Sequence, residues 1–263
     1  MVHEVAAAGF DDAADYEAAR PSYPPDAVAW LVEQLHLEAG RRVADVAAGT
    51  GKLTRLLVPT VGTGLLAVEP VPGMRATFRR VVAEVPLVAA TAEALPFVRA
   101  SLDAITVAQA WHWFDHDRAC REAARVLRPG GRLGLVWNAR DRSEPWVDEV
   151  WSIMDRVEKN APWRDHDRWR DSAMGATPGY TAMGPMPGFR DVQTAEFRHV
   201  QQTTPEGMLR RVASVSHVAV LPAVEREAVL AQVRGLLATH PDTRGRTVLH
   251  VPYRVDCSWT ERL

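Results

Sequence analysis

Short apolar runs alternate with amphipathic segments over the first half of the chain, from about residue 25 to residue 138. Residues 42–51 are typical of a buried strand that ends in a glycine-containing turn, and residues 65–70 are typical of a second strand. Between the two, apolar residues recur at helical spacing, so a helix is expected directly after the turn. Strands that alternate with helices form parallel sheets. The pattern therefore predicts an α/β fold with a doubly wound sheet of about seven strands.

Two more helices and a strand continue this alternation. A helix is expected to begin at Pro25, with one apolar face toward the sheet. A second helix should be capped by Asp115 or Asp117 and should end at a turn formed by residues 129–131. Residues 132–137 then read as the fifth strand.

The regular alternation is lost after this strand. Residues 146–157 have the apolar spacing of a helix, and residues 158–188 are rich in proline, glycine, tryptophan and charged residues. A flexible linker rarely contains residues such as Trp163 and Trp169. We therefore expect this segment to be an irregular lid inserted into the fold.

The last part of the chain returns to strands and helices. A sixth strand is expected at residues 191–201, amphipathic helices from Thr204 and Glu225, and a final strand at residues 249–259. All parts are expected to form one structural domain. We assign residues 1–140 to the core with its N-terminal lead, 141–190 to a cap or lid insertion, and 191–263 to the last strands with two inserted cap helices.

Composition narrows the class of protein. The chain has 263 residues, a formal net charge of −2 and 24% charged residues, which argues against nucleic acid or a membrane surface as a partner. The N-terminus lacks the basic flank and apolar stretch of a signal peptide, so a cytoplasmic location is expected. Cys120 and Cys257 are expected to be buried free thiols. Composition leaves the oligomeric state open.

The most informative chemistry lies in the turn after the first strand. Asp45 ends the strand, Gly49 and Gly51 allow a ligand to approach the backbone, and Glu69 follows Gly49 at the end of the second strand. In doubly wound sheets, a carboxylate placed in this way binds a ribose. The spacing matches neither a dinucleotide fingerprint nor a phosphate-binding loop. Because Asp45 would attract an ammonium or sulfonium, the sequence predicts a nucleoside-type cofactor that carries a positive charge.

The turn resembles motif I of class I S-adenosylmethionine (SAM) dependent methyltransferases, commonly Asp-x-Gly-x-Gly-Thr-Gly, with Ala47 at the position of the first glycine. Four further segments resemble this family in the same order. They are residues 10–24, which resemble the lead of enzymes grouped with trans-aconitate methyltransferases, and residues 91–97, 108–115 and 126–133.

The resemblance implies a Rossmann-like core, SAM as the cofactor, and a small-molecule acceptor. It places Glu69 at the ribose hydroxyls and Asp45 near the ammonium, through water or together with the backbone of the turn. Arg20 becomes a partner for the cofactor's carboxylate. The residues expected to bind SAM are Tyr16, Arg20, Asp45, Ala47, Gly49, Thr50, Gly51, Glu69, Ala92, Glu93 and Gln109.

His112 lies where the acceptor should arrive, after the fourth strand. A histidine there can remove a proton from a hydroxyl or amine, but it can equally be a structural residue that holds the loop. The same loop and the end of the fifth strand supply a candidate substrate pocket. Its residues are Trp111, Trp113, Trp137, Asn138 and Arg140. No metal site is expected, since the nearby histidines and aspartates do not share one face of an element.

The favoured function is methyl transfer from SAM to a carboxyl or hydroxyl oxygen of a small molecule. Two alternatives stay open, because a fold does not determine a function. The same fold can hold SAM for a cyclisation or rearrangement of a bound substrate. It can also serve as a non-enzymatic SAM sensor or scaffold.

Overall fold

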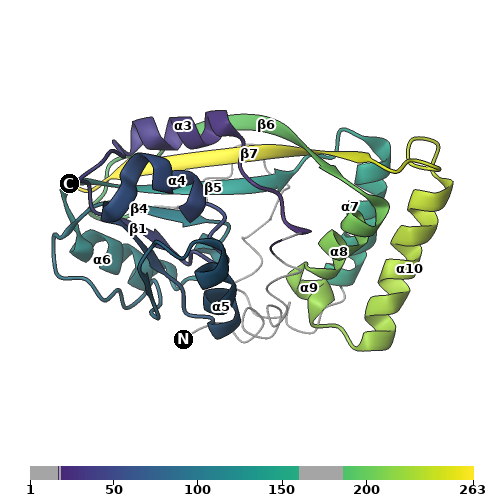
Figure 1. Cartoon of the computed structure of the whole chain (residues 1–263), viewed down its shortest axis with the longest axis horizontal. Coiled ribbons are helices and arrows are strands. Elements are labelled where there is room, and N and C mark those ends of the chain that lie inside the picture. Colours follow the sequence, from purple (N-terminus) through teal and green to yellow (C-terminus); the bar gives the residue numbers. More distant parts are fainter. Residues whose placement is uncertain (1–16, 18, 160–185) are drawn as a thin grey trace.

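The computed structural model describes residues 17, 19–159 and 186–263 (Figure 1). Its centre is a seven-stranded sheet in the order β3-β2-β1-β4-β5-β7-β6. The first five strands in this order are parallel, and β7 is antiparallel to both β5 and β6. The predicted α/β fold with a doubly wound sheet is thus confirmed. The strands are β1 (Val43–Val46), β2 (Leu65–Val68), β3 (Leu87–Val88), β4 (Leu102–Ala108), β5 (Leu127–Arg140), β6 (Gln193–Thr203) and β7 (Leu249–Glu261).

Helices cover both faces of the parallel part of the sheet (Figure 1). One face packs against α3 (Pro25–Gln34), α4 (Thr54–Val61) and α5 (Pro72–Val81), and the other packs against α6 (His116–Val126). The neighbouring residues Val43 and Ala44 of β1 are both fully buried, but they belong to the cores on opposite faces. Burial on both faces explains why apolar residues occupy neighbouring positions of this strand rather than alternating with exposed polar ones.

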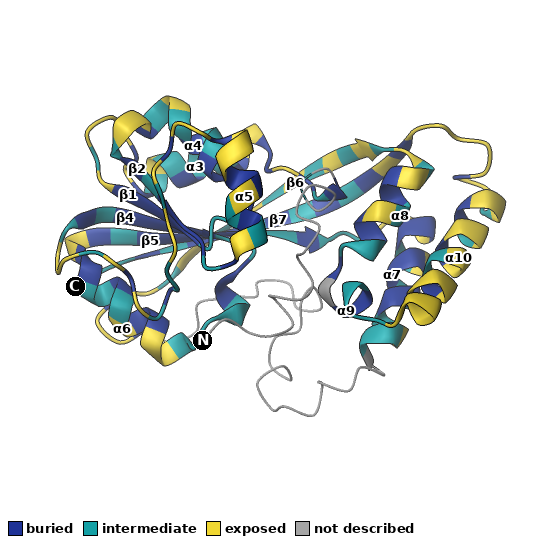
Figure 2. Cartoon of the chain, turned by 60° about the horizontal axis from the view of Figure 1, so that its bottom comes forward, coloured by how far each residue is buried: buried dark blue, intermediate teal, exposed yellow. Residues whose placement is uncertain are grey.

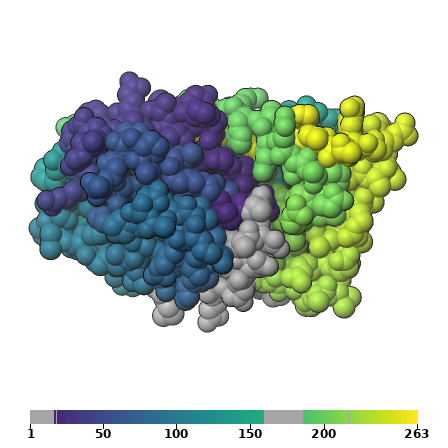
Figure 3. All heavy atoms as spheres, viewed as in Figure 1, coloured from purple at the N-terminus to yellow at the C-terminus, as the bar shows by residue number. Residues whose placement is uncertain are grey.

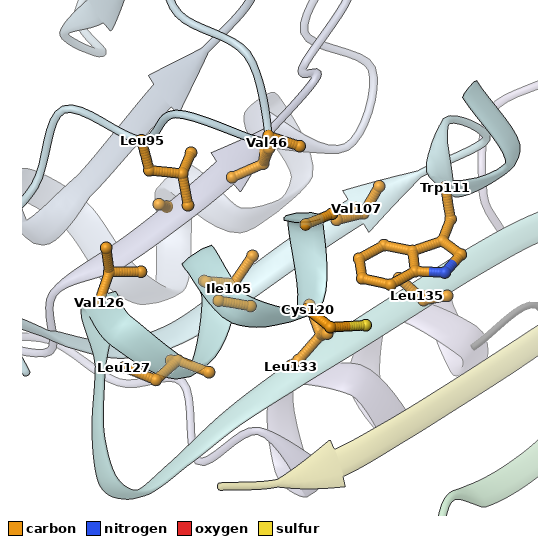
Figure 4. Close-up of a cluster of buried hydrophobic side chains, with 14 of the residues drawn as sticks. Val46, Leu95, Ile105, Val107, Trp111, Cys120, Val126, Leu127, Leu133 and Leu135 are labelled. Atoms are coloured by element: carbon orange, nitrogen blue, oxygen red, sulfur yellow. The ribbon is translucent and has the colours of Figure 1, made fainter. Parts of the chain in front are cut away.

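The core under α6 is drawn in Figure 4. Val126 and Cys120 of the helix belong to the same buried cluster as Val107 of β4 and Leu135 of β5. Trp111, which follows β4, inserts its ring into the same cluster and is only 5% exposed. Both cysteines of the chain are buried free thiols, as predicted.

A helical unit stands beside this core. It consists of α7 (Pro145–Lys159), α8 (Pro205–Ala213), α9 (Ser216–Ala219) and α10 (Ala223–Thr239). The strands β5, β6 and β7 have 14, 11 and 13 residues, against four in β1, and their extensions reach the unit (Figures 1 and 2). The inward faces of the helices form a separate core with the start of β7. The long strands therefore hold the helical unit at a fixed place next to the parallel core.

The structure corrects one local expectation and adds two elements that were not predicted. Residues 129–131, expected to form a turn before the fifth strand, lie within β5, which already begins at Leu127. Leu102 pairs with Leu127 and Ala104 with Arg132, so the intervening residues of β5 form an irregularity in the ladder. The helix α5 and the strand β3 were not predicted from the sequence. The helix α5 begins with a proline-glycine pair, and the strand β3 has only two residues.

Most of the expected lid, residues 160–185 with Trp163 and Trp169, lies outside the described residues. No helix in the described part of the chain combines the length and apolar composition that a membrane span requires.

Candidate active site

A cavity lies at the carboxyl ends of the parallel strands, where doubly wound sheets bind ligands. The N-terminal segment and the helical unit complete its wall, and Figure 3 shows the purple N-terminal residues between the blue core and the green helices. The wall consists of Arg20, Pro21 and Tyr23; Ala47, Ala48, Gly49, Thr50, Lys52 and Leu53; Glu69, Pro70, Val71 and Met74; Thr91, Ala92 and Glu93; Ala108, Gln109, Ala110, Trp113 and Phe114; and Asn138 and Arg211.

The turn after β1 has a left-handed backbone at three positions. The φ angles are 55° at Ala47, 59° at Gly49 and 90° at Gly51. This conformation costs a non-glycine residue about 1–2 kcal/mol, so the surrounding turn must hold Ala47 in place. Alanine thus preserves the backbone geometry at the position where the motif usually has glycine. Ala47 and Gly49 line the cavity, whereas Gly51 does not.

The two glycines of the turn serve different purposes. A Cβ atom on Gly51 would lie 2.6 Å from Cγ2 of Val82 and 3.0 Å from Cδ2 of Phe78, so this glycine permits the close approach of α5. A Cβ atom on Gly49 would meet no atom within 4 Å. Its backbone N–H instead donates to Glu69 Oε2 at 2.8 Å. Gly51 therefore supports packing, and Gly49 supports the cavity wall.

Glu69 is a buried carboxylate in that wall, with 4% of the residue exposed. While Gly49 N–H binds one oxygen, the N–H of Val71 donates to Oε1 at 2.8 Å. Burial raises the pKa of the Glu69 carboxyl, and the two hydrogen bonds oppose this effect. A carboxylate oxygen can accept more than one hydrogen bond. Each oxygen therefore retains the capacity to accept from a ligand hydroxyl.

Asp45 lies behind the turn, fully buried and outside the cavity wall. Its Oδ1 accepts from the Thr106 hydroxyl at 2.9 Å, and its Oδ2 accepts from the Thr54 hydroxyl. Loss of hydration raises the pKa of Asp45 to about 6, although both hydroxyls favour the charged form. The sequence led us to expect Asp45 near the ammonium, through water or together with the backbone of the turn, and in the structure Asp45 does not line the cavity itself. The carboxylate supports the turn from behind.

The opposite wall follows the ends of β3 and β4. The Glu93 carboxylate accepts from the backbone N–H of Asp115 at 2.9 Å, which ties this wall to the start of α6. Gln109 has a φ of 58°, and its N–H donates to Val136 O at 3.1 Å. Such left-handed backbone on a residue other than glycine is concentrated at functional sites. Beyond Gln109, the rings of Trp113 and Phe114 make the wall apolar.

The N-terminal segment bridges the core and the helical unit. The Glu17 carboxylate accepts from the Thr50 hydroxyl and pairs with Lys52 Nζ at 3.1 Å, which binds the segment to the turn. On the other side, Arg20 Nη2 donates to Ser214 O at 2.7 Å, at the end of α8. The segment therefore closes one side of the cavity.

Comparison with known proteins identifies the family. The model of the methyltransferase domain family matches residues 44–135. The chain is 42% identical to an uncharacterized methyltransferase of Mycobacterium tuberculosis, over 92% of this chain and 90% of that protein. It is 32% identical to an uncharacterized methyltransferase-like protein of Schizosaccharomyces pombe, over 92% and 91% of the two chains. A solved structure of a proposed type II methyltransferase from Anaeromyxobacter dehalogenans matches with a TM-score of 0.63 and 25% identity, over 92% and 96% of the chains.

The chain belongs to the class I SAM-dependent methyltransferases. This membership makes the protein a methyltransferase rather than a non-enzymatic scaffold. The structure brings most of the residues that the sequence assigned to the cofactor into one wall. They are Arg20, Ala47, Gly49, Thr50, Glu69, Ala92, Glu93 and Gln109. Asp45 and Gly51 lie outside the wall, and Tyr16 lies outside the described residues.

The predicted substrate residues of the methyltransferase divide into two groups. Trp113 and Asn138 line the cavity. Trp111 belongs to the core under α6. Trp137 does not line the cavity, and its ring centroid lies 4.8 Å from that of His112. The His112 ring also lies 4.7 Å from the Trp113 ring and is not part of the wall. His112 thus supports an aromatic wall residue from behind.

Arg140 does not line the cavity either. Its guanidinium pairs with Asp155 at 2.9 Å and stacks over the Trp151 ring at 4.7 Å. Burial lowers the pKa of Arg140 and the Asp155 carboxylate raises it. Arg211 of α8 lines the cavity in its place, together with Arg20 of the N-terminal segment.

Among the wall residues of the methyltransferase that sequence reasoning did not single out, Arg211 is a buried charged side chain. It is 8% exposed and lies on the same helix as the buried Met208 and Val212. Helical spacing was the available signal. An arginine three residues after Met208 and four before Val215 falls on the apolar face of the helix that packs inward. Charged residues are rarely buried on such a face unless they have a partner, so this position indicates a functional role.

Proposed function

We propose that this methyltransferase transfers the methyl group of SAM to an oxygen of a small molecule, at a carboxyl or hydroxyl group. SAM, when bound, supplies a methyl group on a positively charged sulfur; an acceptor oxygen forms a bond to that carbon, the sulfur–carbon bond breaks, and the electron pair stays on sulfur in S-adenosylhomocysteine (SAH). The residues of the chain bind the two molecules, align them and exclude water. Alignment alone can lower such a barrier by about 7–11 kcal/mol.

The cavity wall fits a nucleoside joined to an amino acid. At one end, the Glu69 carboxylate is buried and oriented by two backbone N–H groups, ready to accept from the two ribose hydroxyls. The left-handed backbone at Ala47 and Gly49 brings main-chain groups against the middle of the cavity. At the other end, Arg20 offers a guanidinium for the carboxylate of the cofactor. The Asp45 charge behind the turn favours a cationic ligand.

The extent of the cavity is the observation that best supports methyl transfer to a second molecule. Its wall continues beyond the turn and Glu69 to Asn138 on β5 and Arg211 on α8. The helical unit therefore supplies part of a space that a cofactor held by the turn does not need. We assign this part of the cavity to the acceptor, with Trp113 as its apolar wall.

The wall favours a carboxylate over a hydroxyl acceptor. A hydroxyl has to lose its proton, whereas a carboxylate with a pKa near 4 is already an anion at neutral pH. No histidine is among the described residues that line the cavity. Lys52 is paired with Glu17, and Glu93 accepts from a backbone N–H. A carboxylate needs no proton acceptor from the enzyme.

Mass spectrometry of the reaction mixture tests this function. With SAM alone, the purified enzyme should release no product above the spontaneous background. With a library of small carboxylic acids and alcohols, we expect SAH together with an acceptor that is heavier by one CH2. Methylthioadenosine formed from SAM alone would favour the cyclase alternative. A product that has rearranged without consumption of SAM would show that the cofactor only assists another reaction.

A further inference from the structure

Arg211 is a buried cation with unused hydrogen-bond donors. The residue is 8% exposed, and it lines the acceptor part of the cavity. Its Nε and Nη1 atoms are buried and have no hydrogen-bond partner among the described residues. A guanidinium that loses its hydration needs an anion or acceptors in exchange. The described residues supply no such group to these two atoms, and a ligand in the cavity can supply it.

The surroundings of Arg211 add positive rather than negative charge. Arg140 and Arg211 both stack on the ring of Trp151, at 4.7 and 5.4 Å. One carboxylate, Asp155, pairs with Arg140 at 2.9 Å and with Arg142 at 3.0 Å. This carboxylate is shared between two other arginines, and no carboxylate in the described part of the chain forms an ion pair with Arg211.

The nearby His217 adds no charge that could balance the guanidinium of Arg211. It is 3% exposed, and burial together with the nearby arginines lowers its pKa to about 3, so its ring is neutral at physiological pH. Its buried Nε2 also has no hydrogen-bond partner among the described residues. The protein thus maintains a positive, desolvated pocket next to the acceptor space.

We propose that Arg211 anchors a carboxylate of the acceptor that is distinct from the oxygen receiving the methyl group. The inference rests on the proposed function, and it narrows the acceptor class to dicarboxylic acids and hydroxy acids. The anchored carboxylate makes and breaks no covalent bond during transfer. It fixes the acceptor so that its second oxygen faces the methyl group. Because the guanidinium is already desolvated, a neutral analogue would leave it unpaired, which gives strong discrimination.

Arg20 and Arg211 divide the anionic groups between them in this arrangement. Arg20 belongs to the N-terminal segment, which Glu17 joins to the turn through Thr50, and its Nη2 donates to Ser214 O at the end of α8. Arg211 lies on α8 itself, and its buried Nε and Nη1 have no hydrogen-bond partner among the described residues. In the proposed arrangement Arg20 binds the carboxylate of SAM, and Arg211 binds a carboxylate of the acceptor.

Thermal unfolding of the SAH-saturated enzyme tests the anchor directly. The probes are succinate, glutarate and inorganic phosphate, each compared with sodium chloride at equal ionic strength. At ten times its Kd a bound dicarboxylate should raise the Tm by roughly 3 °C. Arg211→Met should abolish the rise. The matched control, Arg198→Met, removes an arginine whose side chain is 70% exposed on β6 and should keep it. Arg211→Lys should keep part of the rise.

An equal rise in Arg211→Met, or no rise in the wild type, would overturn the anchor. A response to phosphate alone would show that the pocket binds phosphate esters rather than carboxylates, which also contradicts the proposal. Calorimetry with SAH separates the two arginines. Affinity within about twofold of wild type is expected for Arg211→Met, and a loss beyond tenfold would assign Arg211 to the cofactor.

The methylation assay separates failure of the anchor from failure of the proposed function. Transfer to glutarate but not to its monoamide, glutaramate, is the expected pattern if glutarate is accepted. Transfer confined to neutral acceptors would leave the function intact and overturn the anchor. A dicarboxylate response without transfer to any carboxyl or hydroxyl compound would instead overturn the proposed function.

Discussion

Replacement of Asp45 by asparagine should stabilise the fold at neutral pH and weaken binding of SAM. Burial raises the pKa of Asp45 from its ordinary value of 3.8 to about 6. Between these values the folded protein holds a proton that the unfolded chain has released, so stability falls as the pH rises through this window. At a pH above about 6, the buried charge lowers the free energy of unfolding by about 3 kcal/mol. Asparagine removes this charge, and the hydroxyls of Thr54 and Thr106 can donate to or accept from its amide.

Urea unfolding from pH 4 to pH 8 measures this effect. The free energy of unfolding of Asp45→Asn should be close to that of wild type at pH 4 and about 1–3 kcal/mol higher than wild type at pH 7.5. Asp191 is exposed, so the control variant Asp191→Asn should show no stability difference from wild type that increases with pH. SAM affinity at pH 7.5 should fall roughly tenfold, and SAH affinity should fall less because SAH lacks the sulfonium charge. A stability difference that is constant with pH would refute the assignment of a raised pKa, and unchanged SAM affinity would refute a role for the charge.

Three substitutions test other parts of the site. Gly51→Ala should lower the free energy of unfolding by about 2–5 kcal/mol, because the new Cβ would collide with Val82 and φ is positive, whereas Gly49→Ala should cost only about 1–2 kcal/mol. Equal losses in urea unfolding would contradict the different roles of the two glycines. His112→Ala should leave SAH affinity unchanged and reduce turnover less than about tenfold, since its ring stands behind Trp113. A loss near a hundredfold with intact binding would establish His112 as the base.

The sequence predicted those features that local chemistry determines. The alternation of apolar runs and helical spacing was sufficient for the parallel sheet, although the two-residue strand β3 was not predicted. Gly49 and Glu69 could be placed together because strand ends of a parallel sheet meet at one edge. These inferences need only short segments and the general geometry of the fold.

Contacts between distant segments could not be predicted in the same way. Asp45 does not reach the cavity, because the hydroxyls of Thr54 and Thr106 bind its oxygens. The motif around Asp45 gives no sign of Thr106, which lies on β4, 61 residues later in the chain. Arg211 meets the cavity only because the long antiparallel strands position α8. Arg140, which the sequence placed in the candidate substrate pocket, is paired with Asp155 on a helix that follows in the chain. Side-chain partners of this kind depend on the tertiary structure.

Calorimetric titration of SAH into Glu69→Ala tests the central claim most directly, since that claim makes the buried carboxylate the ribose partner in the cavity. The account predicts a loss of about 1–3 kcal/mol in binding of SAH and SAM, with circular dichroism confirming that the variant is folded. The control variant, Glu84→Ala, removes an exposed carboxylate and should bind like wild type. Equal affinities for Glu69→Ala and wild type, or heat from NAD in place of SAH, would contradict the account.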